Sequence, residues 1–151
     1  NNITLKNEDI TSEMVQKAAK AIGVDVFIET LPNTYQYQVK ERGAVLSTGQ
    51  RQLIAFLRAY VSQPRILILD EATSSVDSQS EQMIQKALEK LTENRTSIII
   101  AHRLATIQKA DRILVMDQGQ IVEQGTHQSL LEMKDGVYRN LYEKQFLNAE
   151  V

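Results

Sequence analysis

Two short apolar runs, separated by a stretch with helical periodicity, constrain the fold of this chain more than any other feature. The first run is RILIL at 65–69 and the second is SIIIA at 97–101. Between them, apolar residues recur over 78–91 at the spacing of an amphipathic helix. Apolar runs of this length are typical of strands that are covered on both faces in a parallel sheet. The sequence therefore predicts a strand–helix–strand unit.

Further elements are predicted on both sides of this unit. A cap at Thr11 or Ser12, apolar residues spaced by three and four, and Gly23 just past the last of them predict the first helix. The other predicted helices cover about 25–30, 49–62 and 104–109, with an irregular loop at 33–46. A third strand at 112–116, a hairpin partner at 120–123 and a helical tail at 126–146, broken near 135–136, complete the prediction.

Polar side chains follow both strands of the central unit. Asp70 and Glu71 come directly after the first strand, and His102 follows the second. Because ligands in open parallel sheets bind at the carboxyl ends of the strands, we expect these side chains on one rim. The aspartate suits Mg²⁺ or its water, the glutamate an attacking water, and the imidazole a terminal phosphate. Taken alone, the Asp–Glu pair is more often a loop start or a helix cap, and the histidine is more often structural.

A second candidate site is the start of the helix at 49–62. Ser47 and Gln50 have the spacing of a capping box, in which each side chain bonds to the other residue's backbone N–H. The N–H groups and the dipole of a helix N-terminus also attract anions. The segment therefore predicts a helix start and leaves an anion-binding role open.

The composition excludes several classes of protein. With 17 basic and 19 acidic residues, the formal charge is −2, so no basic excess points to nucleic acid or to an anionic membrane surface. The chain has no cysteine, which excludes disulfides, thiol nucleophiles and cysteine-ligated metals. The longest apolar run is far shorter than the roughly 20 residues of a membrane-spanning helix.

The order of these motifs resembles the nucleotide-binding domain of ABC transporters. Residues 46–50 (LSTGQ) resemble the signature motif of the family, 66–70 (ILILD) the Walker B strand, and 75–77 (SVD) the D-loop. Glu71 stands at the position of the catalytic glutamate, and His102 at that of the switch histidine. The resemblance covers nearly the whole chain.

Two further segments resemble one branch of this family, the exporters of lipids, drugs and peptides. The segment YQVKERG at 37–43 is similar to a loop that these exporters place against their membrane helices. The segment GQIVEQGTHQSLL at 119–131 is similar to the end of their domains.

The resemblance implies an α/β fold. It implies a partial P-loop NTPase core of parallel strands with flanking helices, plus part of the helical subdomain that carries the signature motif. A single partial domain would then comprise a helical portion at 1–64, an α/β core at 65–125 and a helical tail at 126–151.

The resemblance also implies ATP and Mg²⁺ as cofactors and a head-to-tail dimer of domains. In the family, each ATP lies between the P-loop of one domain and the signature motif of the other. Asp70 would then support Mg²⁺, Glu71 and His102 would act in catalysis, and Asp77 would lie at the seam between the domains. The residues expected to contact the partner's nucleotide are Ser47, Thr48, Gly49 and Gln50.

Three departures from the family pattern stand out. Thr48 replaces a glycine of the signature motif and Lys40 a glycine of the exporter-like loop, which puts the usual nucleotide and membrane-partner contacts in doubt. A P-loop needs G-x-x-x-x-G-K-[ST], but no lysine here precedes Ser or Thr, and no two of the six glycines lie five apart. We therefore expect a carboxy-terminal portion of the domain, inactive by itself, whose sheet has an uncovered edge or face.

The expected function is ATP hydrolysis that drives export, at the cytoplasmic face of the plasma (inner) membrane. The expected partners are a second nucleotide-binding domain and a transmembrane domain, with no nucleic acid. Two alternatives remain: a related ATPase of DNA repair or translation without membrane helices, and a catalytically inert interaction module.

Overall fold

The structure is a computed structural model of the chain and describes residues 3–5, 7–39, 45–70 and 78–144. The predicted roles of Lys40, Glu71 and Asp77 fall outside these residues. The chain forms two compact units, which are described separately. The first contains the described residues up to Leu69 and those at 78–99; the second contains Asp70 and those from Ile100 onward.

The helices and strands agree with the predicted order. Up to the end of the second strand they are α1 (Ser12–Ile22), α2 (Asp25–Glu29), the 3₁₀ helix η1 (Thr34–Gln36), α3 (Thr48–Ser62), β1 (Ile66–Asp70), α4 (Ser78–Thr92) and β2 (Thr96–Ile100). They continue with α5 (Leu104–Gln108), β3 (Ile113–Asp117), β4 (Gln120–Gly125), α6 (His127–Glu132) and α7 (Val137–Tyr142). One short element, η1, lies in a segment that the sequence predicts to be irregular.

The ends of α1 show why its sequence forms a helix there. The Oγ1 atom of Thr11 accepts a hydrogen bond from the backbone N–H of Met14 at 3.2 Å, which satisfies one of the free donors of the first turn. Gly23 follows with φ of 72°, a left-handed conformation that costs glycine little. Both predicted boundaries of this helix are confirmed.

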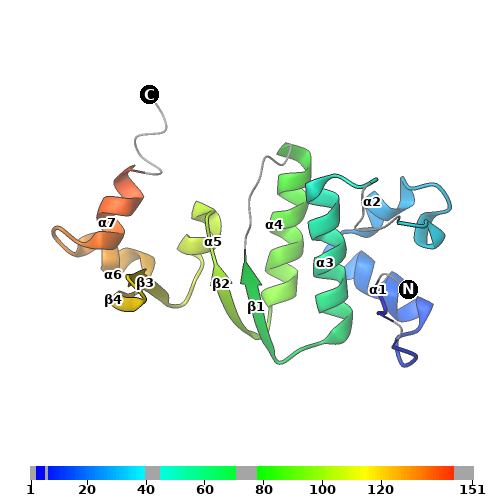
Figure 1. Cartoon of the computed structure of the whole chain (residues 1–151), viewed down its shortest axis with the longest axis horizontal. Coiled ribbons are helices and arrows are strands. Elements are labelled where there is room, and N and C mark those ends of the chain that lie inside the picture. The colour runs from blue at the N-terminus through cyan, green and yellow to red at the C-terminus, as the bar shows by residue number, and fades with distance from the viewer. Residues whose placement is uncertain (1–2, 6, 40–44, 71–77, 145–151) are drawn as a thin grey trace. The chain divides into compact units, whose positions relative to one another are not determined.

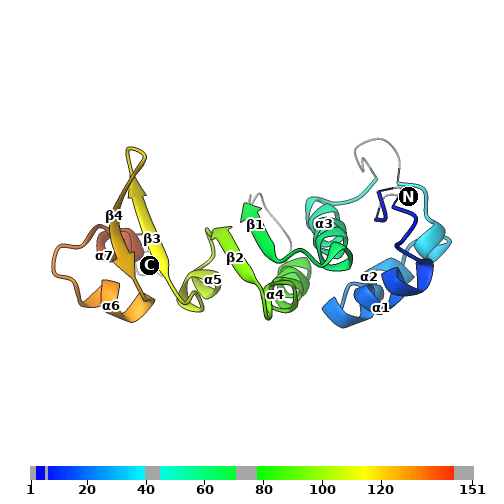
Figure 2. The ribbon, with the colours of Figure 1, turned by 90° about the horizontal axis from the view of Figure 1, so that it is seen from below.

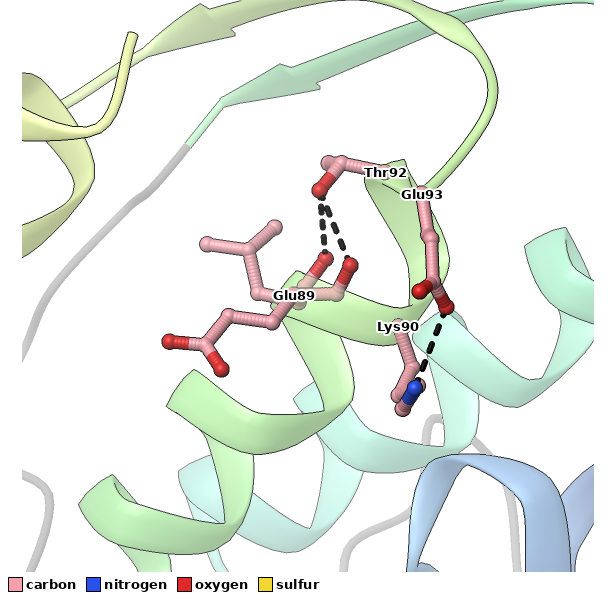
Figure 3. A network of polar contacts seen from close by, with 5 residues as sticks. Glu89, Lys90, Thr92 and Glu93 are labelled. Atoms are coloured by element: carbon pink, nitrogen blue, oxygen red, sulfur yellow. Dashed lines mark hydrogen bonds and ion pairs between the residues drawn. The ribbon is translucent and has the colours of Figure 1, made fainter.

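The end of α4 is closed by local polar contacts (Figure 3). The hydroxyl of Thr92 donates to the carbonyl oxygens of Leu88 at 3.0 Å and Glu89 at 3.2 Å. The ammonium group of Lys90 lies 3.1 Å from the carboxylate of Glu93. These contacts satisfy carbonyls near the end of the helix and put a cation in its last turn, where the helix dipole favours one.

The core of the first unit lies among α1, α3 and α4, which pack against one another. Leu53 and Leu57 of α3 and Ile84 and Leu91 of α4 are fully buried in it. Figure 1 shows α3 and α4 side by side, both running opposite to β1 and β2. Apolar contacts among these three helices therefore make up most of the core of the first unit.

β1 and β2 are hydrogen-bonded neighbours, and both strands point the same way in Figure 1. Together with α4 they form the predicted strand–helix–strand unit. Leu67, Leu69 and Ile99 contact the helical core. Because side chains alternate along a strand, the residues between them face the opposite side.

That opposite face differs from the prediction that both faces are covered. Its side chains are exposed by 63% at Ile66, 71% at Ile68, 55% at Ile98 and 54% at Ile100. The apolar runs therefore supply more apolar surface than the described part of this chain covers.

The second unit is built on a hairpin (Figure 2). β3 and β4 pair antiparallel, with an irregularity between Val115 and Met116. The turn between them carries positive φ at Gln118 (45°) and Gly119 (78°), as a tight two-residue hairpin turn requires. The buried cluster of this unit consists of Val115, Leu130 and Tyr138.

Candidate functional site

The start of α3 is held by a complete capping box. The Ser47 Oγ atom accepts a hydrogen bond from the Gln50 backbone N–H at 3.2 Å, and the Gln50 Oε1 atom accepts one from the Ser47 N–H at 2.9 Å. The predicted capping box is therefore confirmed. It fixes the backbone of 47–50 at the helix N-terminus, where peptide N–H groups and the dipole favour an anion.

The capping box still leaves hydrogen-bond donors for a ligand. It occupies the backbone N–H groups of Ser47 and Gln50 and one side-chain oxygen of each residue, and does not use the Ser47 hydroxyl proton or the Gln50 side-chain amide N–H groups. Ser47 is exposed, whereas Thr48 and Gln50 are partly buried and Gly49 is buried. The donor chemistry of the segment suits a phosphate, which only accepts hydrogen bonds.

Arg51, which belongs to none of the predicted sites, also contacts this segment. Its Nη1 atom donates to the Leu46 carbonyl at 2.7 Å, and its Nη2 atom donates to the Thr48 Oγ1 atom at 3.0 Å. The spacing of three between Thr48 and Arg51 is the signal that could have shown this contact, because residues three apart are neighbours on a helix.

The second group of predicted residues lies at the ends of the paired strands. Asp70 is the last residue of β1 and is exposed. His102 follows the last residue of β2 by two positions and is also exposed. Because β1 and β2 are parallel neighbours, both residues lie at the same edge of the sheet, as predicted. The segment from Ser47 to Gln50 belongs to the first unit and is described by itself.

The carboxylate of Asp70 is of the kind that binds Mg²⁺. Mg²⁺ is commonly held by one or two carboxylates, together with waters and substrate phosphates, and an exposed strand-end carboxylate can supply one such ligand. Among residues 3–5, 7–39, 45–70 and 78–144, no three His, Asp or Glu side chains form a ready metal cage.

Comparison with known proteins decides the family. The family model described as ABC transporter matches residues 1–74. An uncharacterized ABC transporter ATP-binding protein, YknV, of Bacillus subtilis is 49% identical over 148 residues, which is 98% of this chain and 24% of that protein. An ATP-dependent lipid A-core flippase of Saccharophagus degradans is 53% identical over 145 residues, 96% of this chain and 25% of that protein.

A solved structure agrees with these relatives. It is a bacterial Atm1-family ABC exporter with ATP bound, with a TM-score of 0.82 and 41% sequence identity. The match covers 96% of this chain and 25% of that chain. The chain belongs to the ABC transporter family. The predicted α/β fold, a partial P-loop NTPase core, is confirmed with it.

This ABC transporter chain is much shorter than the relatives that it matches. It spans about a quarter of the length of the relatives described above. Within the ranges that the structure describes, no helix has the combination of length and apolar character needed to cross a bilayer. The activity and the partners of the whole protein are therefore taken up below as proposals.

The ABC transporter chain also contains an aromatic cluster that the sequence analysis missed. His127 is partly buried at the start of α6, and its Nδ1 atom lies 2.6 Å from the Tyr138 hydroxyl. The ring centroid of His127 lies 5.4 Å from that of Tyr142, and Tyr138 stacks on Tyr142 with centroids 6.4 Å apart. These contacts join α6 to α7.

A carboxylate of β4 completes this arrangement. The two oxygens of Glu123 accept hydrogen bonds from the backbone N–H groups of Val137 at 2.6 Å and Tyr138 at 2.9 Å. Glu123 thus caps α7 from a distant part of the sequence, which the spacing of residues along the chain could not reveal. Both contacts stabilise the second unit.

Proposed function

We infer that this chain is part of the ATP-binding and ATP-hydrolysing domain of an ABC exporter, in which hydrolysis at a head-to-tail pair of domains drives export. The observation that carries the proposal is the shared edge of the parallel strands β1 and β2, where Asp70 ends the first strand and His102 follows the second. The similarity to an ATP-bound exporter at 41% identity supports it. The relatives include an ATP-dependent flippase, which supports an exporter over a soluble ATPase.

At this edge, we assign Asp70 to Mg²⁺, Glu71 to the attacking water and His102 to the terminal phosphate. A strand-end carboxylate can orient the metal, and a second carboxylate can take a proton from water as phosphoryl transfer begins. Mg²⁺, when bound, would neutralise charge that develops on the phosphates. The exposure of Asp70 and His102 supports these roles, because both are accessible to a ligand.

The start of α3 would contact the nucleotide of the partner domain. Ser47, Thr48, Gly49 and Gln50 would supply hydrogen-bond donors at a helix N-terminus, and Asp77 would lie at the seam between domains. The capping box supports this role, because it fixes the segment and leaves the Ser47 hydroxyl proton and the Gln50 side-chain N–H groups as donors. A preorganised donor set costs less to order when the ligand binds.

The proposed partners are a second nucleotide-binding domain and a transmembrane domain, and the proposed location is the cytoplasmic face of the plasma (inner) membrane. We assign the helical portion of the domain to 1–64, the α/β core to 65–125 and the helical tail to 126–151. No P-loop sequence occurs in these 151 residues, so we propose that the chain by itself neither binds ATP tightly nor hydrolyses it.

The test uses the complete protein encoded by the reading frame that contains this chain. Glu71→Gln should retain ATP binding and lower ATP turnover by about 10²-fold or more, because it removes a general base. The matched control is Glu132→Gln, the same change at an exposed glutamate of α6, which should leave turnover unchanged. Undiminished turnover of Glu71→Gln would remove Glu71 from this role. A complete protein that does not bind ATP would contradict the proposed function itself.

A further inference from the structure

We propose that Arg51 is a positioning residue for nucleotide contact at the start of α3, and that the Thr48 hydroxyl is one of its two anchors. The proposal rests on the proposed function of the segment 47–50. It gives the unusual threonine of this motif a specific role in holding the segment in shape.

The guanidinium group of Arg51 joins two acceptors at the start of α3. Arg51 Nη1 and Nη2 belong to one planar group, and they bond to the Leu46 carbonyl at 2.7 Å and to the Thr48 hydroxyl oxygen at 3.0 Å. Because the two nitrogens have a fixed separation, both bonds together fix the distance between the two acceptors. Those acceptors lie on either side of Ser47, so the side chain clamps the turn that precedes the helix.

One of the two acceptors belongs to a residue of the apolar core. The side chain of Leu46 is 6% exposed and belongs to the apolar cluster of the first unit. The Arg51 backbone N–H also donates to the Ser47 carbonyl at 3.0 Å, which begins the helix. The clamp therefore links the exposed Ser47 to a buried residue before it and to the helix after it. Mobility of this segment would be reduced at both ends.

The positive charge of Arg51 lies near the N-terminus of α3. A cation near a helix N-terminus is disfavoured by the helix dipole, so the dipole does not explain why this side chain folds back toward the start of α3. The two hydrogen bonds do explain it, and they keep a positive charge at the helix end that already favours anions. Glycine at position 48 would remove the side-chain acceptor, whereas threonine supplies one.

The experiment measures the KM and kcat for ATP in the complete protein encoded by the surrounding reading frame. Thr48→Val keeps the shape of the side chain and removes the acceptor, whereas Thr48→Ser keeps the acceptor. Because a hydrogen bond to a charged group is lost, Thr48→Val should raise the KM about fivefold and leave kcat within about twofold. Thr48→Ser should restore the KM to within about twofold of the wild-type value.

A double variant tests whether Thr48 acts through Arg51. Arg51→Gln should raise the KM as Thr48→Val does, and the double variant should raise it no further, because both changes remove the same contact. Thr92→Val is the matched control: it removes a threonine hydroxyl that bonds only locally at the end of α4, and should leave the KM unchanged.

The outcomes separate this proposal from the proposed function. A wild-type protein that does not turn over ATP overturns both. An active wild type, with Thr48→Val equal to it, overturns the positioning role alone. The role is also overturned if Thr48→Ser fails to restore the KM, or if the effects of the two single variants multiply in the double variant.

Discussion

The two units of the molecule are stabilised in different ways. The first has a large apolar cluster, to which α1, α3 and α4 all contribute fully buried or nearly buried side chains. Among its described residues, the second buries Val115, Leu130 and Tyr138 in its cluster and adds polar contacts from Glu123 and His127. Apolar packing is distributed over many side chains, whereas the second unit depends on a few specific hydrogen bonds.

This difference affects how each unit tolerates change. An apolar core loses stability in proportion to the volume removed, and neighbouring side chains can adjust in part. A hydrogen bond to one particular side chain, by contrast, is lost outright when that side chain is changed. The following predictions rank single changes in the two units, from the largest expected effect to the smallest.

The largest effect is expected in the core of the first unit. Leu57 is 0% exposed, so Leu57→Ala should lower the free energy of unfolding by about 2–5 kcal/mol through lost burial and a residual cavity. Urea unfolding followed by circular dichroism measures this change. Leu141→Ala, at a side chain that is 52% exposed in α7, is the control and should have a much smaller effect. Equal effects would mean that the first unit does not depend on this core.

The next effect is expected at the α7 cap of the second unit. Glu123→Gln leaves one acceptor oxygen in place of two and removes the charge, and should destabilise this unit by about 1–3 kcal/mol. Hydrogen exchange should accelerate at the amides of Val137 and Tyr138, while amides of α3 keep their protection. Glu132→Gln is the matched control, and accelerated exchange throughout the chain would contradict a contact confined to this unit.

A smaller effect is expected from alkaline pH. Burial, and then the charge of Tyr142, raises the pKa of Tyr138 above its ordinary value of 10.0. The unfolded chain therefore ionises first, so this contribution to stability is complete below about pH 10 and is lost as the pH rises through the folded-state pKa. Unfolding titrations between about pH 9 and 12 should show this loss and a shallower slope for Tyr138→Phe.

Tyr35 provides the comparison in the first unit. Its pKa is raised by burial and by the negative charges of Asp25 and Glu29. Tyr35→Phe should therefore reduce the alkaline loss in the first unit and leave the loss in the second. An unchanged pH slope in both variants would contradict the assignment to these two hydroxyls.

The smallest effect on stability is expected on the open face of the β1–β2 sheet. Ile68 is 71% exposed, so Ile68→Lys should change the free energy of unfolding by no more than about 0.5 kcal/mol. The same change should reduce self-association of the 151-residue chain, because an exposed apolar sheet face favours it. Sedimentation at several concentrations measures this. Monomeric behaviour of the unchanged chain at all concentrations would contradict the expectation.

Local sequence signals predicted most of the fold. The cap at Thr11, the left-handed Gly23 and the capping box of Ser47 and Gln50 use side chains within three or four residues of the atoms that they satisfy. The apolar periodicity of 78–91 likewise depends on neighbours along one helix. The apolar runs alone predicted strands covered on both faces, because such a run does not reveal what covers it. The absence of the P-loop segment predicted an uncovered edge or face of the sheet, and the exposed side chains of β1 and β2 agree with that.

The candidate site was predictable to a similar degree. The polar ends of β1 and β2 follow from the strand–helix–strand pattern, and their common edge is confirmed for Asp70 and His102. Glu71 and Asp77 lie outside the described residues, so their assignments stay predictions. Arg51 was missed, because a cation in the first turn of a helix is not a capping signal. The contact between Glu123 and α7 was missed, because Val137 and Tyr138 lie 14 and 15 positions after Glu123 in the sequence.

The cap that Glu123 provides for α7 has a consequence for the evolution of this region. A Cβ atom at Gly136 would lie 3.3 Å from the Glu123 Oε1 atom and 3.2 Å from the Met133 Cβ atom, both closer than ordinary contact. A larger residue at 136 would therefore push against the carboxylate at the position where it accepts from α7. Positions 123 and 136 should consequently covary among relatives, with an acidic residue at the first accompanied by glycine at the second.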